Sequence, residues 1–177
     1  MDYKRTFMKI NKLEPVKKGM VNVIIETPRG SQNKFDFEPD LKIFKLNKTL
    51  PMGTVFPFDF GFIPGTIGED GDPLDILVIM DQPVFPGTYV VCRLIGALLA
   101  KQKERDGKVV QNDRLIGVSD CSVLYADIKK PQELNKAMVT EIENFFIDYN
   151  KHEGKEFTPT GWVDSIGAMQ LIEKSLK

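Results

Sequence analysis

Hydrophobic and polar residues follow a strand-like pattern through the first two thirds of the chain. Residues 21–26 form a short apolar run rich in β-branched side chains, and a turn rich in Pro, Gly, Ser and Asn follows it. Residues 34–38 alternate strictly, so that Lys34 and Asp36 share one face of a strand. We predict that the two segments pair as a β-hairpin, which would bring Glu26 near Lys34 and Asp36. Further strands are predicted at residues 43–46, 75–80, 89–100 and 115–118.

The hydrophobic period changes to that of a helix in the last third. Apolar residues recur every three or four positions there, at Leu134, Met138, Ile142, Phe145 and Tyr149. Pro131 suits the first turn of this helix. A second helix is predicted at residues 165–176, with Asp164 or Ser165 as its cap and Met169, Ile172 and Leu176 facing inward. Short strands separated by Gly and Pro turns favour a closed sheet. The predicted fold class is therefore α+β, a small β-barrel of five to seven strands with two flanking α-helices.

The composition excludes several functions. The 177 residues are expected to form one domain, 1–177, and 24 Lys and Arg nearly balance 25 Asp and Glu. A net charge of −1 argues against partners held by a general positive field, so we expect no nucleic acid and no membrane. The N-terminus lacks the apolar centre of a signal peptide, and we expect a cytoplasmic protein. A single histidine argues against histidine-rich metal sites and Ser-His-Asp triads.

The segment 69–75 carries the strongest chemical signal. Asp70, Asp72 and Asp75 fall within six residues, and Asp75 opens the apolar run of residues 76–80. Carboxylates this close repel one another unless a cation neutralises them, and oxygen ligands select a hard ion such as Mg²⁺ or Mn²⁺. A solvated acidic turn is the alternative, but such a turn has no need of an aspartate that enters a buried strand.

Residues 70–75 resemble the signature of the soluble, magnesium-dependent (family I) inorganic pyrophosphatases. The resemblance extends from about residue 14 to residue 176 and includes segments 23–28, 34–36, 56–62, 85–87, 93–96 and 145–149. It implies an OB-like barrel that hydrolyses inorganic diphosphate to two phosphates with Mg²⁺. It also implies a homo-oligomer, with a hexamer favoured.

The resemblance further implies roles for individual residues. Asp72 would orient or deprotonate the attacking water and contact a metal, and Asp70 and Asp75 would hold the activating metals. Phosphate-binding roles fall to Lys34, Lys45, Arg114 and Tyr149, and supporting acidic roles to Glu26 and Asp36. Two more metal-binding acids are expected downstream, one at Asp113 and the other at Glu104 or Asp106.

Several residues depart from the family pattern. Phe56 and Phe60 stand where the family has tyrosines. Four other positions differ as well, namely Lys45 for an arginine, Asp36 for a glutamate, Asn150 for a lysine and Asn112 for an acid. Two alternatives therefore stay open: a divergent relative that hydrolyses another small phospho-compound, and a non-catalytic OB-like binding protein. Taken without the resemblance, Lys34 and Asp36 fit the solvated face of a strand equally well, and Arg114 fits a surface ion pair with Asp113.

Overall fold

The computed structural model describes residue 10 and residues 13–176, which form ten β-strands and two α-helices. The strands are β1 (Val16–Lys17), β2 (Met20–Thr27), β3 (Asn33–Glu38), β4 (Ile43–Thr49), β5 (Asp59–Phe62), β6 (Asp75–Ile79), β7 (Tyr89–Lys103), β8 (Val109–Gln111), β9 (Arg114–Ser119) and β10 (Glu156–Asp164). The helices are α1 (Lys136–His152) and α2 (Ser165–Lys174).

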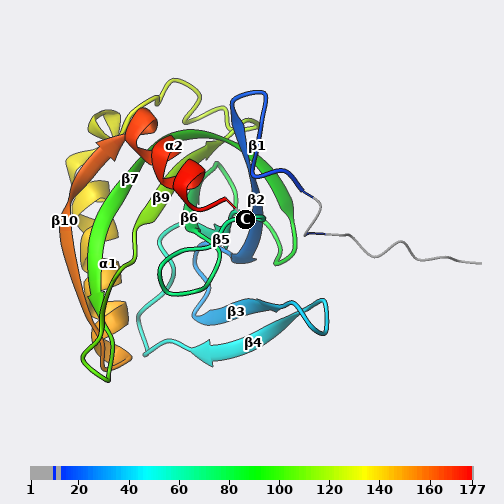
Figure 1. Cartoon of the computed structure of the whole chain (residues 1–177). Coiled ribbons are helices and arrows are strands. Elements are labelled where there is room, and N and C mark those ends of the chain that lie inside the picture. The colour runs from blue at the N-terminus through cyan, green and yellow to red at the C-terminus, as the bar shows by residue number, and fades with distance from the viewer. Residues whose placement is uncertain (1–9, 11–12, 177) are drawn as a thin grey trace, which may run out of the picture.

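Five strands close into a barrel in the order β2–β5–β6–β9–β7, and β7 pairs back onto β2. The long strand β7 makes this closure, because its first residues pair with β2 while its later residues pair with β9, β8 and β10. In Figure 1, α1 flanks the β10 side of the sheet and the β3–β4 hairpin projects below the barrel. The predicted barrel with two flanking helices is confirmed, and strands outside the ring of five extend it.

Two hydrophobic clusters hold the helices to the sheet. Successive residues of β6 alternate between them, so that Leu77 and Ile79 join the cluster that contains Phe146 of α1. Ile76 and Val78 join the cluster that contains Ile172 of α2. Because β6 is covered on both faces, it reads as an unbroken apolar run rather than an alternating one. Asp75 is thereby fixed at the first position of a rigid strand.

The predicted hairpin between residues 21–26 and 34–38 is wrong. β3 pairs with β4, while β2 pairs with β7 along one edge and with β1 and β5 along the other. A strand whose two edges are used inside a barrel has no edge left for its neighbour in sequence. Side chains nevertheless join the two segments. Thr27 exchanges hydrogen bonds with the backbone of Phe35, and Glu26 Oε1 accepts the Phe37 amide at 2.8 Å.

α1 begins later than the pattern predicts, whereas α2 begins at Ser165, as predicted. Pro131 opens a 3₁₀ turn, and α1 follows after Asn135, whose side chain accepts the Ala137 amide. Asp164 caps α2, as predicted. Leu176 does not face inward, because α2 ends at Lys174 and leaves it 53 % exposed. None of the helices in residues 13–176 is long and apolar enough to cross a membrane.

Candidate active site

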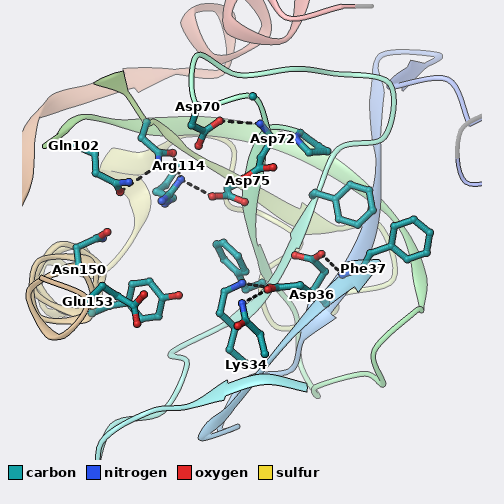
Figure 2. Close-up of a pocket in the computed structure, with 18 of the residues that line it drawn as sticks. Lys34, Asp36, Phe37, Asp70, Asp72, Asp75, Gln102, Arg114, Asn150 and Glu153 are labelled. Carbon is teal, nitrogen blue, oxygen red and sulfur yellow. Dashed lines mark hydrogen bonds and ion pairs between the residues drawn. The ribbon is translucent and has the colours of Figure 1, made fainter. Parts of the chain in front are cut away.

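A cleft of about 880 Å³ opens where the loop before β6 faces the β3–β4 hairpin, the β7–β8 hairpin and the end of α1. Figure 2 shows the aspartates of that loop facing Arg114, with Lys34 and Asp36 on the hairpin side and Asn150 and Glu153 across the cleft. Eight of the ten predicted site residues line it: Glu26, Lys34, Asp36, Asp70, Asp72, Asp75, Arg114 and Tyr149. Segments far apart in sequence therefore meet as the resemblance implied.

The loop that carries the aspartates is a tight turn that a buried hydroxyl group holds in place. Gly71 has a φ of +92°, a conformation that glycine adopts without strain, and the Asp72 amide donates to Asp70 Oδ1 at 3.1 Å. The buried hydroxyl of Thr66 accepts the Leu74 amide at 3.0 Å. These bonds fix both ends of the turn, so Asp70 and Asp72 lie at the cleft mouth directly before β6.

Asp75 and Arg114 form an ion pair at the inner end of the cleft. β6 and β9 run parallel with Ile76 opposite Leu115, which places the residues just before them side by side. Arg114 Nη1 lies 2.5 Å from Asp75 Oδ2, and Arg114 is only 5 % exposed. Its guanidinium carbon lies 5.1 Å from the ring centroid of Phe146. Its Nε is buried and has no hydrogen-bond partner among the described residues, a group that a ligand oxygen would satisfy.

A chain of polar contacts runs outward from Arg114 along the β7–β8 wall. Arg114 Nη1 donates to Asn112 Oδ1, and Asn112 Nδ2 donates to Gln102 Oε1 at 3.2 Å. Gln102 Nε2 then donates to Glu104 Oε1 at 2.5 Å, and Glu104 Oε2 pairs with Lys155 Nζ at 2.8 Å. This wall therefore presents two neutral amides next to Arg114 and a paired carboxylate further out.

The β3–β4 hairpin supplies the opposite wall. Lys34 pairs with Asp36, which also accepts from Asn47. Lys48 Nζ lies 2.7 Å from Glu153 Oε1 and 4.6 Å from the ring centroid of Tyr149. The predicted phosphate ligand Lys45 is exposed and is not among the lining residues, whereas Lys48 is. Lys48 lies opposite Lys34 and Lys45 opposite Asp36, with a bulge at Asn47 between them, and of the two lysines it is Lys48 that lines the cleft.

The predicted downstream metal acids do not enter the cleft as free ligands. Asp113 Oδ1 accepts the Ala100 amide at 3.0 Å and Gln111 Nε2 at 2.5 Å, and Asp113 is not a lining residue. Of the two alternatives for the other acid, Asp106 holds the Lys108 amide outside the cleft. Glu104 does line the cleft but is paired with Lys155. The residues that occupy this wall are Asn112 and Gln102.

Burial shapes the protonation of the site. Desolvation raises the pKa of Glu26 to about 8, although the Phe37 amide and Lys34 oppose it. Desolvation also raises the pKa of Asp75, which Arg114 opposes, and the pKa of Asp72, where the charge of Asp70 adds to it. Burial lowers the pKa of Lys48 and raises that of the Tyr149 hydroxyl. Without a ligand, the acidic side of the cleft therefore disfavours the ionised forms of these three carboxyl groups.

The donor chemistry fits a hard divalent cation. Asp70, Asp72 and Asp75 offer carboxylate oxygens from one turn, and the neighbouring charges of Asp70 and Asp72 disfavour ionisation of Asp75 unless a cation is present. Within residue 10 and residues 13–176, however, no three carboxylate, imidazole or thiolate side chains are gathered closely enough to hold an ion. The fit therefore rests on the type of donor and on the charge, not on preformed coordination.

Sequence reasoning missed Lys48, Glu153, Gln102 and Lys155 as lining residues. Lys48 is three residues from the predicted lysine, and only the observed contacts of the two side chains distinguish them. Gln102 and Asn112 are neutral, so a search for carboxylates passes over them. For Glu153 and Lys155, no sequence signal marks the turn between α1 and β10 as part of the site.

Comparison with known proteins extends these observations. The family model described as inorganic pyrophosphatase matches residues 23–177. An inorganic pyrophosphatase of Synechocystis is 38 % identical over 162 residues, which cover 91 % of this chain and 92 % of that protein. The inorganic pyrophosphatase of Sulfolobus acidocaldarius is 35 % identical over 170 residues, covering 94 % and 96 %.

Solved structures agree with the sequence comparison. The crystal structure of inorganic pyrophosphatase from Thermus thermophilus superimposes with a TM-score of 0.85 at 33 % identity, covering 95 % of this chain and 97 % of that one. An inorganic pyrophosphatase from Neisseria gonorrhoeae gives a TM-score of 0.85 at 27 % identity, covering 94 % and 96 %. The likeness therefore includes the barrel, both helices and the segments that form the cleft.

Proposed function

The chain belongs to the inorganic pyrophosphatase family, and we propose that it hydrolyses inorganic diphosphate to two phosphates. The observation that carries this proposal is that Asp70, Asp72 and Asp75 face Arg114 and Lys34 in one cleft. Carboxylates suit a divalent cation, and the guanidinium and ammonium groups suit phosphate oxygens. A metal–diphosphate complex needs both kinds of group around it, and this cleft supplies them.

Asp72 is proposed as the group that orients and deprotonates the attacking water. Its carboxylate has no ion-pair or hydrogen-bond partner in the described part of the chain, and it lies at the solvent-exposed mouth of the cleft. A water can therefore reach it and give up a proton to it. Asp70 and Asp75 are the proposed main metal ligands, with Glu26 and Asp36 supporting them from the hairpin side.

The cationic groups are proposed to hold the phosphates and to stabilise charge on the departing oxygen. Arg114 is well placed for this role, because Asp75 and the face of Phe146 fix its guanidinium while its Nε stays without a partner among the described residues. Lys34 and Tyr149 complete the set, and Lys48 takes the role first assigned to Lys45. No covalent nucleophile is required.

We propose Mg²⁺ as the ion, with Mn²⁺ as a substitute. When bound, the ion supplies a lower pKa for its coordinated water and neutralises charge on both phosphates. We also propose a homo-oligomer, with a hexamer favoured, and a cytoplasmic location with no nucleic-acid or membrane partner. The near-neutral charge balance of the chain supports the last point.

Phosphate release from diphosphate tests the proposal directly. We expect the purified protein to release phosphate from diphosphate only when Mg²⁺ is present. Its kcat/KM for diphosphate should be at least ~100-fold above that for phosphomonoesters, because diphosphate offers a second phosphate group for Arg114 and Lys34 to bind. EDTA should abolish release and excess Mg²⁺ should restore it. Release from other phospho-compounds but not from diphosphate would assign the divergent-relative alternative. No release from any of them would assign the binding-protein alternative.

A pair of lysine variants tests the cleft assignment on β4. Lys48→Ala should raise KM for diphosphate about 10-fold with a smaller change in kcat, since a charged contact to a phosphate contributes roughly 1.5 kcal/mol. Lys45→Ala removes an equal charge from the same strand but outside the cleft, so its KM should stay within about 2-fold of the wild type. Steady-state kinetics at saturating Mg²⁺ measures both. A larger effect from Lys45→Ala would restore the assignment made from sequence.

A further inference from the structure

The carboxylates of the cleft differ in their availability to a cation. Four already face a lysine or arginine, in the pairs Asp36–Lys34, Asp75–Arg114, Glu104–Lys155 and Glu153–Lys48. A fifth, Glu26, accepts the Phe37 amide behind them. Among the described lining residues, Asp70 and Asp72 are the carboxylates with no cationic partner and no hydrogen bond from outside their own turn, where Asp70 accepts the Asp72 amide. Their combined charge balances one divalent ion.

The wall opposite Asp70 and Asp72 offers almost nothing to a second ion. Gln102 and Asn112 are amides, which carry no charge and bind hard cations more weakly than carboxylates do. Their carbonyl oxygens are also engaged, because Asn112 Oδ1 accepts from Arg114 and Gln102 Oε1 accepts from Asn112. The nearby Asp113 turns its carboxylate toward the Ala100 amide, outside the cleft.

Arg114 adds a repulsive charge to the same place. Its Nη1 bridges Asp75 Oδ2 and Asn112 Oδ1, so a positive charge lies between the aspartate loop and the amide wall. The pair is 6 % and 24 % exposed at its two side chains, and solvent screens the charge only weakly there. A cation near Asn112 would therefore meet repulsion from Arg114, and the carboxylate next to that arginine, Asp75, is already paired with it.

We propose that the Gln102–Asn112 amide pair, together with Arg114, limits the substrate-free protein to one tightly bound divalent cation, held by the loop of Asp70, Asp72 and Asp75. Any further ion enters with the substrate, whose phosphate oxygens supply the ligands that the amide wall lacks. This inference rests on the proposed function for its second part, whereas the count of tightly bound ions in the free protein does not depend on the reaction.

Counting bound Mn²⁺ tests the proposal without any measurement of activity. Titration of the full chain followed by electron paramagnetic resonance should give one tightly bound Mn²⁺ per chain, with any second ion at least ~100-fold weaker. The double variant Gln102→Glu/Asn112→Asp should gain a second tight ion, because it restores two carboxylates to the wall. Asp113→Asn should leave the count at one, since that carboxylate lies outside the cleft, and Asp70→Asn should weaken the single site at least ~10-fold.

Two tight ions on the wild-type protein would overturn the inference, whatever the variants do. So would a double variant that is folded by circular dichroism and still binds one ion. Failure of the double variant to fold leaves the wild-type count and the Asp113→Asn control as the decisive measurements. A wild type that binds one ion but releases no phosphate from diphosphate supports the ion count and overturns the proposed function alone.

Discussion

Asp72→Asn is expected to lower kcat for diphosphate hydrolysis at least ~100-fold, the scale of a positioned general base. The substitution keeps the size of the side chain and removes its ability to accept a proton. The backbone should be little affected, because the loop is held by the Asp72 amide on Asp70 Oδ1 and by Thr66 on Leu74, and neither bond uses the Asp72 carboxylate. The loss should therefore appear in kcat rather than in KM.

Glu69→Gln is the matched control for that experiment. Glu69 lies in the same acidic turn, but its Oε2 accepts the Gln111 amide at 2.9 Å and it does not line the cleft. Its kcat should remain within about 2-fold of the wild type. If Asp72→Asn retains more than a tenth of wild-type kcat at saturating Mg²⁺, Asp72 is not the base. Equal losses in both variants would mean that net charge in the turn, not proton transfer, explains the effect.

The sequence predicts well those strands and helices whose own apolar positions show which of their faces are buried. Residues 76–80 and 115–118 are apolar because the sheet is covered on both faces, and α1 shows a helical stripe because one side packs on the barrel. β10 escaped prediction because it contains Pro159 and Gly161 at a register shift, and exposed residues interrupt its pattern.

Closure of the barrel depends on contacts between distant segments. The predicted hairpin joins β2 to the next strand in sequence, β3, but β2 instead pairs with β5 and β7. Nothing in residues 21–38 encodes the presence of β7, which begins at Tyr89. Sequence pattern therefore gives the list of strands more reliably than it gives their partners.

In the candidate site, too, some features could be predicted from local sequence and others depend on the fold. The aspartate loop could be predicted because its residues are neighbours in sequence, and Arg114 because the family resemblance fixed its place. Near neighbours were harder to separate, since Lys45 and Asp113 were predicted whereas Lys48 and Asn112 line the cleft. A shift of one residue reverses the direction of a side chain on an extended segment, and nothing in the composition marks the bulge that lies between Lys45 and Lys48 in β4.

Arg114→Met should lower kcat/KM for diphosphate about 10³-fold while strengthening Mn²⁺ binding to the free protein. The loss follows from removing a fixed guanidinium that balances charge in the transition state. The gain follows because Asp75 loses its partner, now 2.5 Å away, and its carboxylate becomes available to the cation. A merely misfolded site would lose both properties together, so the opposite signs identify a specific role for Arg114.

The same variant leaves the half-buried carboxylate of Asp75 unpaired, which lowers stability in the absence of metal. Added Mn²⁺ should therefore raise the melting temperature of Arg114→Met more than that of the wild type. Arg114→Lys keeps the charge but not the planar group that reaches both Asp75 and Asn112, so its kcat/KM should fall about 10- to 100-fold with unchanged Mn²⁺ affinity. Weaker Mn²⁺ binding by a folded Arg114→Met would show that the arginine helps to build the metal site instead of competing with it for Asp75.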